Sequence, residues 1–181
     1  DGKCECGEED PNYVPPHVHS WSEATCTEPS KCECGETNGE ALGHAWENCA
    51  CTVCEAVLPT LSVGDSFGFT TEEGFNAALE SGKIALVGDF RSNGDSYQFN
   101  TNSTIQFVAP ANTTVTITGH STNYGVFNVY LNGEKTVMTG ALTFTVTEET
   151  KVVIATGDEG ASYSYIKGIT LEAFIDRTLS P

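Results

Sequence analysis

Cysteine and histidine residues recur at fixed spacing in the first third of the chain. The hexapeptide Lys-Cys-Glu-Cys-Gly-Glu occurs at 3–8 and again at 31–36, and each copy is followed by a His-x-Trp, at 19–21 and 44–46. Thiolate and imidazole are the ligands that structural Zn²⁺ takes, usually four in a tetrahedron. The glycine after each close cysteine pair tolerates the positive φ that such a metal knuckle often needs. The repeat therefore predicts structural zinc binding.

More ligands are present than one ion requires. The candidates are Cys4, Cys6, His19, Cys26, Cys32, Cys34, His44, Cys49, Cys51 and Cys54, with His17 as a further possibility. One grouping makes a Cys3His site of Cys4/Cys6/His19/Cys26 and another of Cys32/Cys34/His44/Cys49. The other grouping centres on Cys26/Cys32/Cys34/His44 and leaves incomplete sets on either side. Both stay open, and about two or three tetrahedral ions are compatible with this supply of ligands.

Disulfide bonding is the alternative reading of the same residues. The 8 cysteines form an even set, as a disulfide framework requires. Disulfides alone would not need a histidine at the same place in each unit, which favours zinc. Trp21 and Trp46 are each expected to pack over their own site as a miniature core.

The distribution of cysteine divides the chain into two predicted domains. Every cysteine precedes residue 55, and 1–59 contains few large aliphatic side chains. A segment of that size with so little apolar bulk needs cross-links or metals to offset its chain entropy. We therefore expect a small metal-stabilised Cys/His-repeat domain at 1–59. Residues 60–181 contain no cysteine and are rich in Val, Ile, Thr, Phe and Tyr, so they can build a core of their own.

Charge excludes one class of partner. The net charge of −17 splits into −10 for 1–59, with 2 basic and 12 acidic residues, and −7 for 60–181, with 6 basic and 13 acidic. Such a surface repels phosphate backbones, so no nucleic-acid partner is expected. No apolar run reaches the ~18–20 residues of a membrane span, and membrane insertion is not expected. No signal peptide is visible, so we expect a mature protein or an excised fragment.

Alternation of apolar and polar residues dominates the second domain. The candidate strands are 65–70, 83–90, 96–100, 104–109, 113–118, 125–131, 135–139, 141–146, 150–155 and 163–174. Asn132-Gly133 lies between two such runs and is a strong signal for a two-residue hairpin. The pattern predicts an all-β fold, a jelly-roll-like β-sandwich. One short helix is expected, with a capping box at Thr70 and Glu73 and its end at Gly82.

No catalytic arrangement is recognisable, so the chain is not expected to be an enzyme. His120 is the only histidine after residue 59 and lies in a polar loop. The neighbouring acidic residues fall in turns, and adjacency along the chain does not give the ~5–9.5 Å separation across a sugar that a glycosidase needs. A structural Ca²⁺ in an acidic loop is a further expectation, with Asp89, Asp95 and Asp158 as ligands.

Glycan binding would require flat aromatic faces beside polar groups. The candidate set is Tyr124, Tyr130 and Tyr163 with Asn123, Asn128 and Lys167. In the run 125–131 the apolar residues share one face, which places Asn128 and Tyr130 on the other. The alternative for each tyrosine is cross-strand packing with its hydroxyl at the surface.

Two segments resemble known families. Residues 24–29 (Ala-Thr-Cys-Thr-Glu-Pro), 32–35 (Cys-Glu-Cys-Gly), 43–46 (Gly-His-Ala-Trp) and 51–54 (Cys-Thr-Val-Cys) resemble a repeat of large secreted proteins of gut Firmicutes. The runs 105–107, 114–117, 127–131, 143–146 and 163–171 resemble β-sandwich modules appended to bacterial pectate lyases and related polysaccharide-active proteins.

These resemblances imply a setting and a role. They imply a secreted or cell-surface location, spacer repeats, and a non-catalytic module that binds a polysaccharide or oligosaccharide, with starch-like α-glucan or pectin as leading candidates. A monomer within a larger multidomain polypeptide is expected. The alternative is a structural spacer or protein-interaction module with no glycan binding of its own.

Overall fold

The computed structural model describes residues 18–118, 128–136, 142–156 and 164–175. The chain divides into two compact units, Asp1–His44 and Ala45–Pro181, which we call the repeat unit and the β unit. Several predicted residues lie outside the described ranges: Cys4, Cys6, His17, His120, Asn123, Tyr124, Asp158 and Tyr163.

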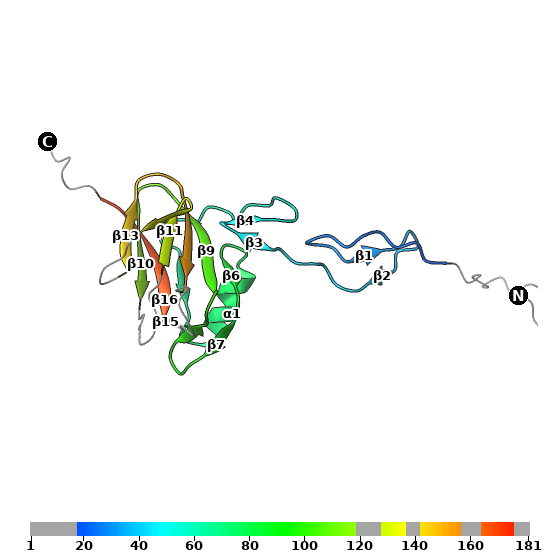
Figure 1. Cartoon of the computed structure of the whole chain (residues 1–181), viewed down its shortest axis with the longest axis horizontal. Coiled ribbons are helices and arrows are strands. Elements are labelled where there is room, and N and C mark those ends of the chain that lie inside the picture. Colours follow the sequence, from blue (N-terminus) through cyan, green and yellow to red (C-terminus); the bar gives the residue numbers. More distant parts are fainter. Residues whose placement is uncertain (1–17, 119–127, 137–141, 157–163, 176–181) are drawn as a thin grey trace, which may run out of the picture. The chain divides into compact units, whose positions relative to one another are not determined.

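The repeat unit contains one short hairpin among its described residues. Strands β1 (Ser30–Lys31) and β2 (Thr37–Asn38) pair antiparallel. The second Cys-x-Cys lies in the turn between them (Figure 1). Buried side chains in the described part of this unit are Cys26 and Cys32, so no apolar core of ordinary size holds it together.

The β unit is built almost wholly of antiparallel strands, which confirms the all-β prediction. Its strands are β3 (Trp46–Glu47), β4 (Ala50–Cys51), β5 (Ser66–Gly68), β6 (Ala85–Val87), β7 (Phe90–Ser92), β8 (Tyr97–Phe99), β9 (Thr104–Ala109), β10 (Thr113–Thr118), β11 (Asn128–Leu131), β12 (Glu134–Thr136), β13 (Thr143–Val146), β14 (Thr150–Ala155), β15 (Ser164–Ile166) and β16 (Gly168–Ala173). Among the described residues there is one helix, α1 (Glu72–Glu80).

Two larger sheets form the body of this unit (Figure 1). One has 4 strands in the order β13-β10-β16-β5, and the other has 5 in the order β12-β11-β14-β9-β6. A smaller sheet of the same unit has 3 strands in the order β15-β8-β7. The Asn132-Gly133 turn joins β11 to β12 as the sequence predicts, with φ of 51° and 86° at its two residues and Leu131 paired with Glu134.

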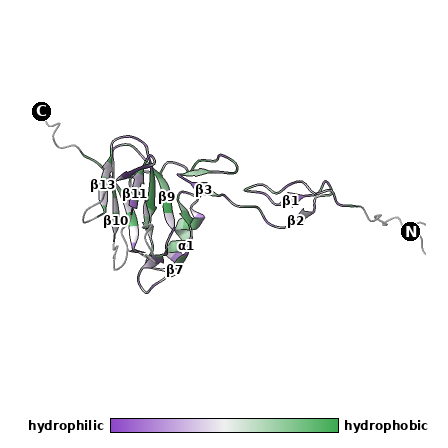
Figure 2. Cartoon of the chain, viewed as in Figure 1, coloured by the Kyte–Doolittle hydropathy of each residue, from purple (hydrophilic) through white to green (hydrophobic). Residues whose placement is uncertain are grey.

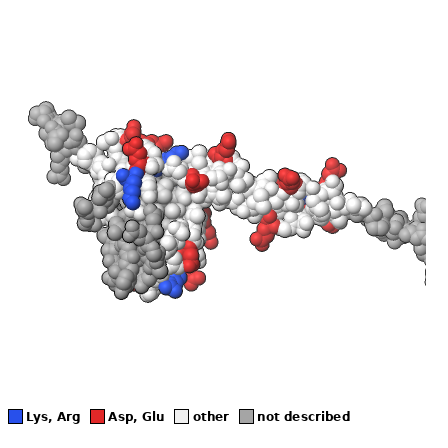
Figure 3. Space-filling view, in the orientation of Figure 1, with Lys and Arg blue, Asp and Glu red and all other residues white. Residues whose placement is uncertain are grey.

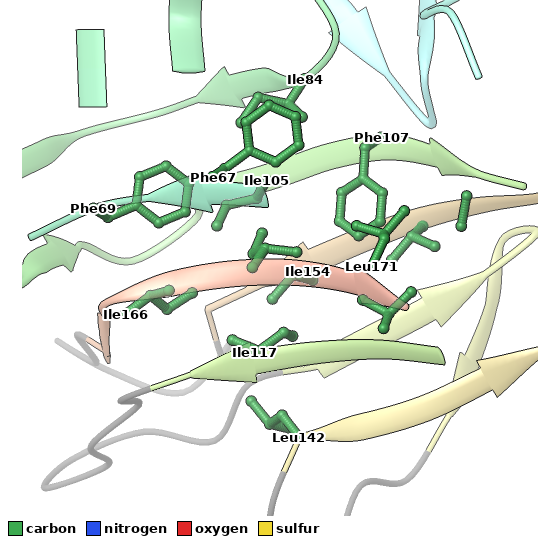
Figure 4. Close-up of a cluster of buried hydrophobic side chains, with 14 of the residues drawn as sticks. Phe67, Phe69, Ile84, Ile105, Phe107, Ile117, Leu142, Ile154, Ile166 and Leu171 are labelled. Atoms are coloured by element: carbon green, nitrogen blue, oxygen red, sulfur yellow. The ribbon is translucent and has the colours of Figure 1, made fainter. Parts of the chain in front are cut away.

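The core lies where the two larger sheets meet. Alternate residues of β10 and β14 are buried, as period-2 geometry requires of strands with one face in the core. Strand β9 is buried along almost its whole length and is mainly hydrophobic (Figure 2). Ile105 and Ile154 from one sheet join Ile117 and Leu171 from the other in a single cluster (Figure 4). Each such side chain contributes ~1.5–3 kcal/mol on full burial, so this unit has its own source of stability.

Helix α1 begins one residue later than the capping-box pattern indicates. The N-cap is Thr71, whose hydroxyl accepts a hydrogen bond from the Gly74 N–H at 3.1 Å. Phe75 is buried and stacks on Tyr97 with ring centroids 4.1 Å apart. The helix ends at Glu80, Ser81 is its C-cap, and Gly82 follows with a φ of +63°. The predicted end is therefore confirmed and the start is shifted.

Glycine 88 divides a segment that the sequence indicates as one strand. The run 83–90 becomes β6 and β7 because Gly88 has a φ of +114°. A Cβ atom there would lie 2.7 Å from the Cα of Ser103. Only glycine avoids both the unfavourable φ and this contact.

Residues 45–58 pack as part of the β unit, although the sequence places the domain boundary at 59/60. The β3–β4 hairpin lies against β9 and contributes Cys49 and the partly buried Trp46 to a small cluster with Ala85 and Val108. Leu58, which follows the hairpin, belongs to the same cluster. The Cys49 N–H donates to Gln106 Oε1 at 2.9 Å. The compact units accordingly separate at 44/45.

Candidate metal centre

Three of the predicted ligands come together in the repeat unit. One ligand atom from each of His19, Cys32 and Cys34 lies within 4.8 Å of the others, a grouping that could hold a metal ion. His19 follows the first hexapeptide, whereas both cysteines belong to the second. The histidine of one repeat thus meets the cysteine pair of the next, and neither grouping drawn from the sequence contains this set.

Strand register explains why these residues meet. Trp21 pairs with Cys32 in an isolated antiparallel bridge. The next pair, Ser22 and Lys31, is closed by the Ser22 N–H donating to the Lys31 carbonyl at 2.9 Å. In an antiparallel pair the residue numbers of partners have a constant sum, so His19 falls opposite Cys34.

The turn after β1 holds the two thiols in a knuckle. The Gly35 N–H donates to the Cys32 carbonyl at 2.8 Å, and the Cys32 N–H donates to the Glu36 carbonyl at 2.8 Å. Gly35 has a φ of +92°, which is the role that the sequence predicts for it. Cys32 is buried and Cys34 is exposed.

The spacing of the ligand atoms suits a tetrahedral ion. Cys34 Sγ lies 3.4 Å from His19 Nδ1. Zinc–sulfur and zinc–nitrogen bonds of about 2.3 and 2.05 Å at a tetrahedral angle put the two ligand atoms about 3.6 Å apart. The observed separation is therefore close to that of two ligands of one ion.

The second nitrogen of His19 is also engaged. Nε2 lies 3.3 Å from Glu36 Oε2. The ring of Trp21 stacks on the imidazole with centroids 5.0 Å apart and planes 17° apart. Trp21 therefore covers one face of the His19 ring, while 39% of its own surface stays exposed.

The two thiols of the knuckle shift each other's pKa in opposite directions. A hydrogen bond from the Cys34 thiol, reinforced by the Cys34 backbone N–H, lowers the pKa of Cys32 to about 6. The same contact raises the pKa of Cys34. The lowered pKa of Cys32 favours its thiolate, which is the form that binds a metal ion.

The other candidate ligands in the described part of the repeat unit, Cys26 and His44, lie on two adjoining segments. Cys26 is buried, and its carbonyl accepts a hydrogen bond from the Gly43 N–H at 3.1 Å. The Leu42 N–H donates to the Thr25 carbonyl at 2.9 Å. These bonds hold the segment that ends at His44 beside Cys26.

Cys51 and Cys54 form a second knuckle, within the β unit. The Glu55 N–H donates to the Cys51 carbonyl at 3.0 Å, and Glu55 itself has a φ of 60°. Cys51 is buried and Cys54 is exposed. This is the compact Cys-x-x-Cys turn that commonly presents two thiolates to one ion.

Cys49 has a different environment from the other cysteines. It is fully buried, and its thiol donates to the Phe107 carbonyl at 3.2 Å. Burial raises the pKa of this thiol to about 11. The structure therefore gives Cys49 a packing role in the β unit instead of the metal-binding role expected from its spacing.

The acidic residues expected to bind Ca²⁺ have other partners. The Asn100 side-chain amide donates to Asp89 Oδ2, and Lys167 Nζ pairs with Asp95 Oδ2. Within the described ranges, neither aspartate belongs to a cluster of three potential metal ligands. A Ca²⁺ site built on this pair therefore gains no support.

The residues predicted to bind glycan are only partly described. Asn128 and Tyr130 lie on β11 and face the same side, opposite Ala155 and Val153 of β14. Asn128 is buried and Tyr130 is half-buried. Lys167 is engaged with Asp95, which lowers the pKa of that carboxyl.

Comparisons with family models, with curated proteins and with solved structures give no match. The fold and the site therefore define the protein by class alone: it is all-β, with a Cys/His cluster that could hold a metal ion.

The full chain is acidic, with 25 Asp and Glu against 8 Lys and Arg. Acidic side chains are spread over the visible face of both units, with scattered basic ones (Figure 3).

Across the described residues, no helix has the length and apolar character needed to span a membrane.

Proposed function

We propose that the chain is a non-catalytic module of a secreted or cell-surface protein, in which Cys/His knuckles bind structural Zn²⁺. The observation that carries this proposal is the convergence of His19, Cys32 and Cys34. Two thiolates and an imidazole favour zinc over the hard cations Ca²⁺ and Mg²⁺, which take oxygen ligands.

The composition of the repeat unit supports a structural role for the ion. The buried side chains in its described part are themselves cysteines, Cys26 and Cys32. Structural zinc supplies about 10–16 kcal/mol of apparent binding energy in zinc-finger peptides, and that energy is folding energy. A metal staple thus replaces the apolar core that this segment lacks, which suits a spacer between larger modules.

Metal and thiol analysis of the full chain tests the proposal. The protein is purified without chelator, its zinc is measured by elemental mass spectrometry, and its thiols are counted after denaturation. We expect bound zinc and recovery of all 8 cysteines as free thiols. Cys32→Ser should lose zinc, whereas Glu33→Gln, an exposed change in the same turn, should not. Absence of both zinc and free thiols would establish disulfides instead.

Glycan binding by the β unit is a second candidate function. The supporting observation is Tyr130, half-buried on the outward side of β11 beside Asn128. A partly exposed aromatic ring presents a flat apolar face, and its hydroxyl presents a polar tip, to a sugar ring. Starch-like α-glucan and pectin are the first ligands to test.

Affinity electrophoresis of the full chain tests this candidate. Retardation by α-glucan or pectin that is lost in Tyr130→Ala and kept in Tyr165→Ala, a half-buried tyrosine of β15, would support it. No retardation in any polysaccharide, or equal retardation of both variants, would rule out this candidate and leave the structural spacer as the proposed function.

A further inference from the structure

The hydrogen-bonding environment of His19 assigns a role to a residue that is not itself a ligand. His19 presents Nδ1 to Cys34 Sγ at 3.4 Å and Nε2 to Glu36 Oε2 at 3.3 Å. The thiol contact and the carboxylate contact thus use opposite nitrogens of the ring. A metal held by the cysteine pair would be reached by Nδ1, which leaves Nε2 as the N–H donor.

The carboxylate contact selects one tautomer of the neutral imidazole. A carboxylate only accepts hydrogen bonds, so its partner Nε2 must carry the proton. Nδ1 is then the unprotonated nitrogen, with its lone pair directed at the cysteine side. The imidazole is therefore oriented for metal binding before the ion arrives, because the outer hydrogen bond of a histidine fixes its tautomer and ring angle.

Glu36 is also tied to the knuckle by its main chain. Its carbonyl accepts the Cys32 N–H at 2.8 Å, while its side chain reaches His19. The nearby cation Lys31 is paired with Glu28 at 3.1 Å, so Lys31 is occupied by another carboxylate. One residue thus connects the cysteine half and the histidine half of the site.

We propose that Glu36 is a positioning residue for the metal centre, accepting the Nε2 proton of His19 so that Nδ1 binds Zn²⁺ together with Cys32 and Cys34. This inference rests on the proposed zinc function. Loss of such an outer partner typically lowers metal affinity by about 10–100-fold without removing a ligand.

Zinc competition on the full chain tests the role. Wild type, Glu36→Ala and Glu36→Gln are titrated against a chromophoric chelator, with Glu40→Ala as an exposed control outside the site. We expect Glu36→Ala to bind Zn²⁺ about 10–100-fold more weakly. Glu36→Gln should recover part of the loss, since its amide oxygen can still accept the Nε2 proton, and Glu40→Ala should match wild type.

Cobalt substitution separates positioning from ligation. The d–d and thiolate charge-transfer bands of Co²⁺ should stay unchanged in Glu36→Ala, because both thiolates and the imidazole remain bound. A change of coordination in that spectrum would make Glu36 a ligand and overturn the proposal. Equal zinc affinity of wild type and Glu36→Ala would also overturn it while leaving zinc binding intact. A wild-type chain that binds neither metal would remove the proposed function itself.

Discussion

At the scale of single residues, Cys49 shows how burial decides what a thiol does. Its sulfur lies on the sheet, with hydrogen bonds to the carbonyls of Phe107 and Val152 at 3.2 and 3.7 Å. A thiol in that position is neutral and closed to reagents, because only the thiolate is nucleophilic. Its neighbours in the sequence, by contrast, lie in knuckle turns.

We expect Cys49 to resist alkylation in the native protein at pH 7 and to react only on unfolding. Cys49→Ala should destabilise the β unit by roughly 1–3 kcal/mol, through the cavity and the lost hydrogen bonds. Denaturant unfolding and peptide mapping of the alkylated chain measure the two effects. Val53→Ala, at a side chain that is 63% exposed, is the control and should change stability little. Rapid native labelling of Cys49 would contradict this account.

The carboxyl group of Asp65 makes the stability of the β unit depend on pH. Its carboxylate accepts the Ser62 N–H at 2.9 Å and pairs with Lys83 at 3.0 Å, and these contacts, the Ser62 N–H above all, lower its pKa. A carboxyl with a pKa lower in the folded state stabilises the fold above its unfolded value of about 3.9, and the contribution disappears as pH falls through the folded pKa.

Asp65→Asn should therefore destabilise the β unit by about 1–2 kcal/mol at pH 7 and have a smaller effect near pH 2–3. Urea midpoints measured between those pH values test the slope. Glu80→Gln, an exposed change in α1, should leave the pH profile as it is. A constant difference between Asp65→Asn and wild type across the whole pH range would refute the linkage.

At the scale of elements, strand pairing decides which histidine and which cysteines can bind the same metal ion. The Trp21–Cys32 bridge places His19 opposite Cys34, so His19 and the second cysteine pair should hold the same ion. His19→Ala, Cys32→Ser and Cys34→Ser should each remove the same equivalent of zinc, and the double variants should lose no more.

Native mass spectrometry of the full chain counts these equivalents. Zinc that survives all three substitutions would be assigned to predicted ligands outside this set, which include Cys4, Cys6, Cys26, His44, Cys51 and Cys54. Loss of zinc in Cys32→Ser but not in His19→Ala would contradict the grouping of His19 with Cys32 and Cys34. It would favour a grouping in which each histidine joins a different cysteine pair.

Gly88 is the element-scale feature that a substitution can test most directly. Alanine there meets both a φ of +114° and a contact with Ser103, whereas Gly64, with a φ of +95°, has open space around it. Gly88→Ala should cost clearly more stability than Gly64→Ala, whose penalty of about 1 kcal/mol is that of the backbone alone. Thermal unfolding of the two variants measures the difference. Equal losses would show that Ser103 moves aside.

The sequence predicts the strands far better than the packing between segments. Residues 104–109, 113–118 and 150–155 are strands with the bounds that the sequence predicts, because apolar–polar alternation is a local property. Gln106 looks like a solvent-facing polar residue of such a strand, yet its amide donates to the Trp46 carbonyl at 3.2 Å under the β3–β4 hairpin. Nothing local marks that partner.

The candidate metal centre was also only partly predictable from the sequence, because its ligands are joined by pairing between separate segments. The cysteines and histidines are recognisable by type, but a repeat suggests that ligands belong to one copy, whereas antiparallel pairing joins His19 of one copy to Cys34 of the next. Cys49 is misleading for a related reason. Its spacing resembles that of a ligand, and only its position against Phe107 and Val152 shows that it packs.

At the scale of the whole molecule, the two units depend on different sources of stability. The β unit has a core contributed by both of its larger sheets. The described part of the repeat unit buries only Cys26 and Cys32. A fold held by metal should be lost when the metal is removed, whereas a fold held by apolar burial should not be.

We therefore expect a strong zinc chelator to unfold the repeat unit and leave the body of the β unit folded. Hydrogen exchange on the full chain should show amides of 18–44 losing protection, while those of β9, β10 and β14 keep it, since their protection reports the apolar core. Added Zn²⁺ should restore the first group. If β9 and β10 lost protection at the same chelator concentration, the stability of the β unit would depend on metal as well. If 18–44 kept its protection in chelator, disulfides rather than zinc would hold the repeat.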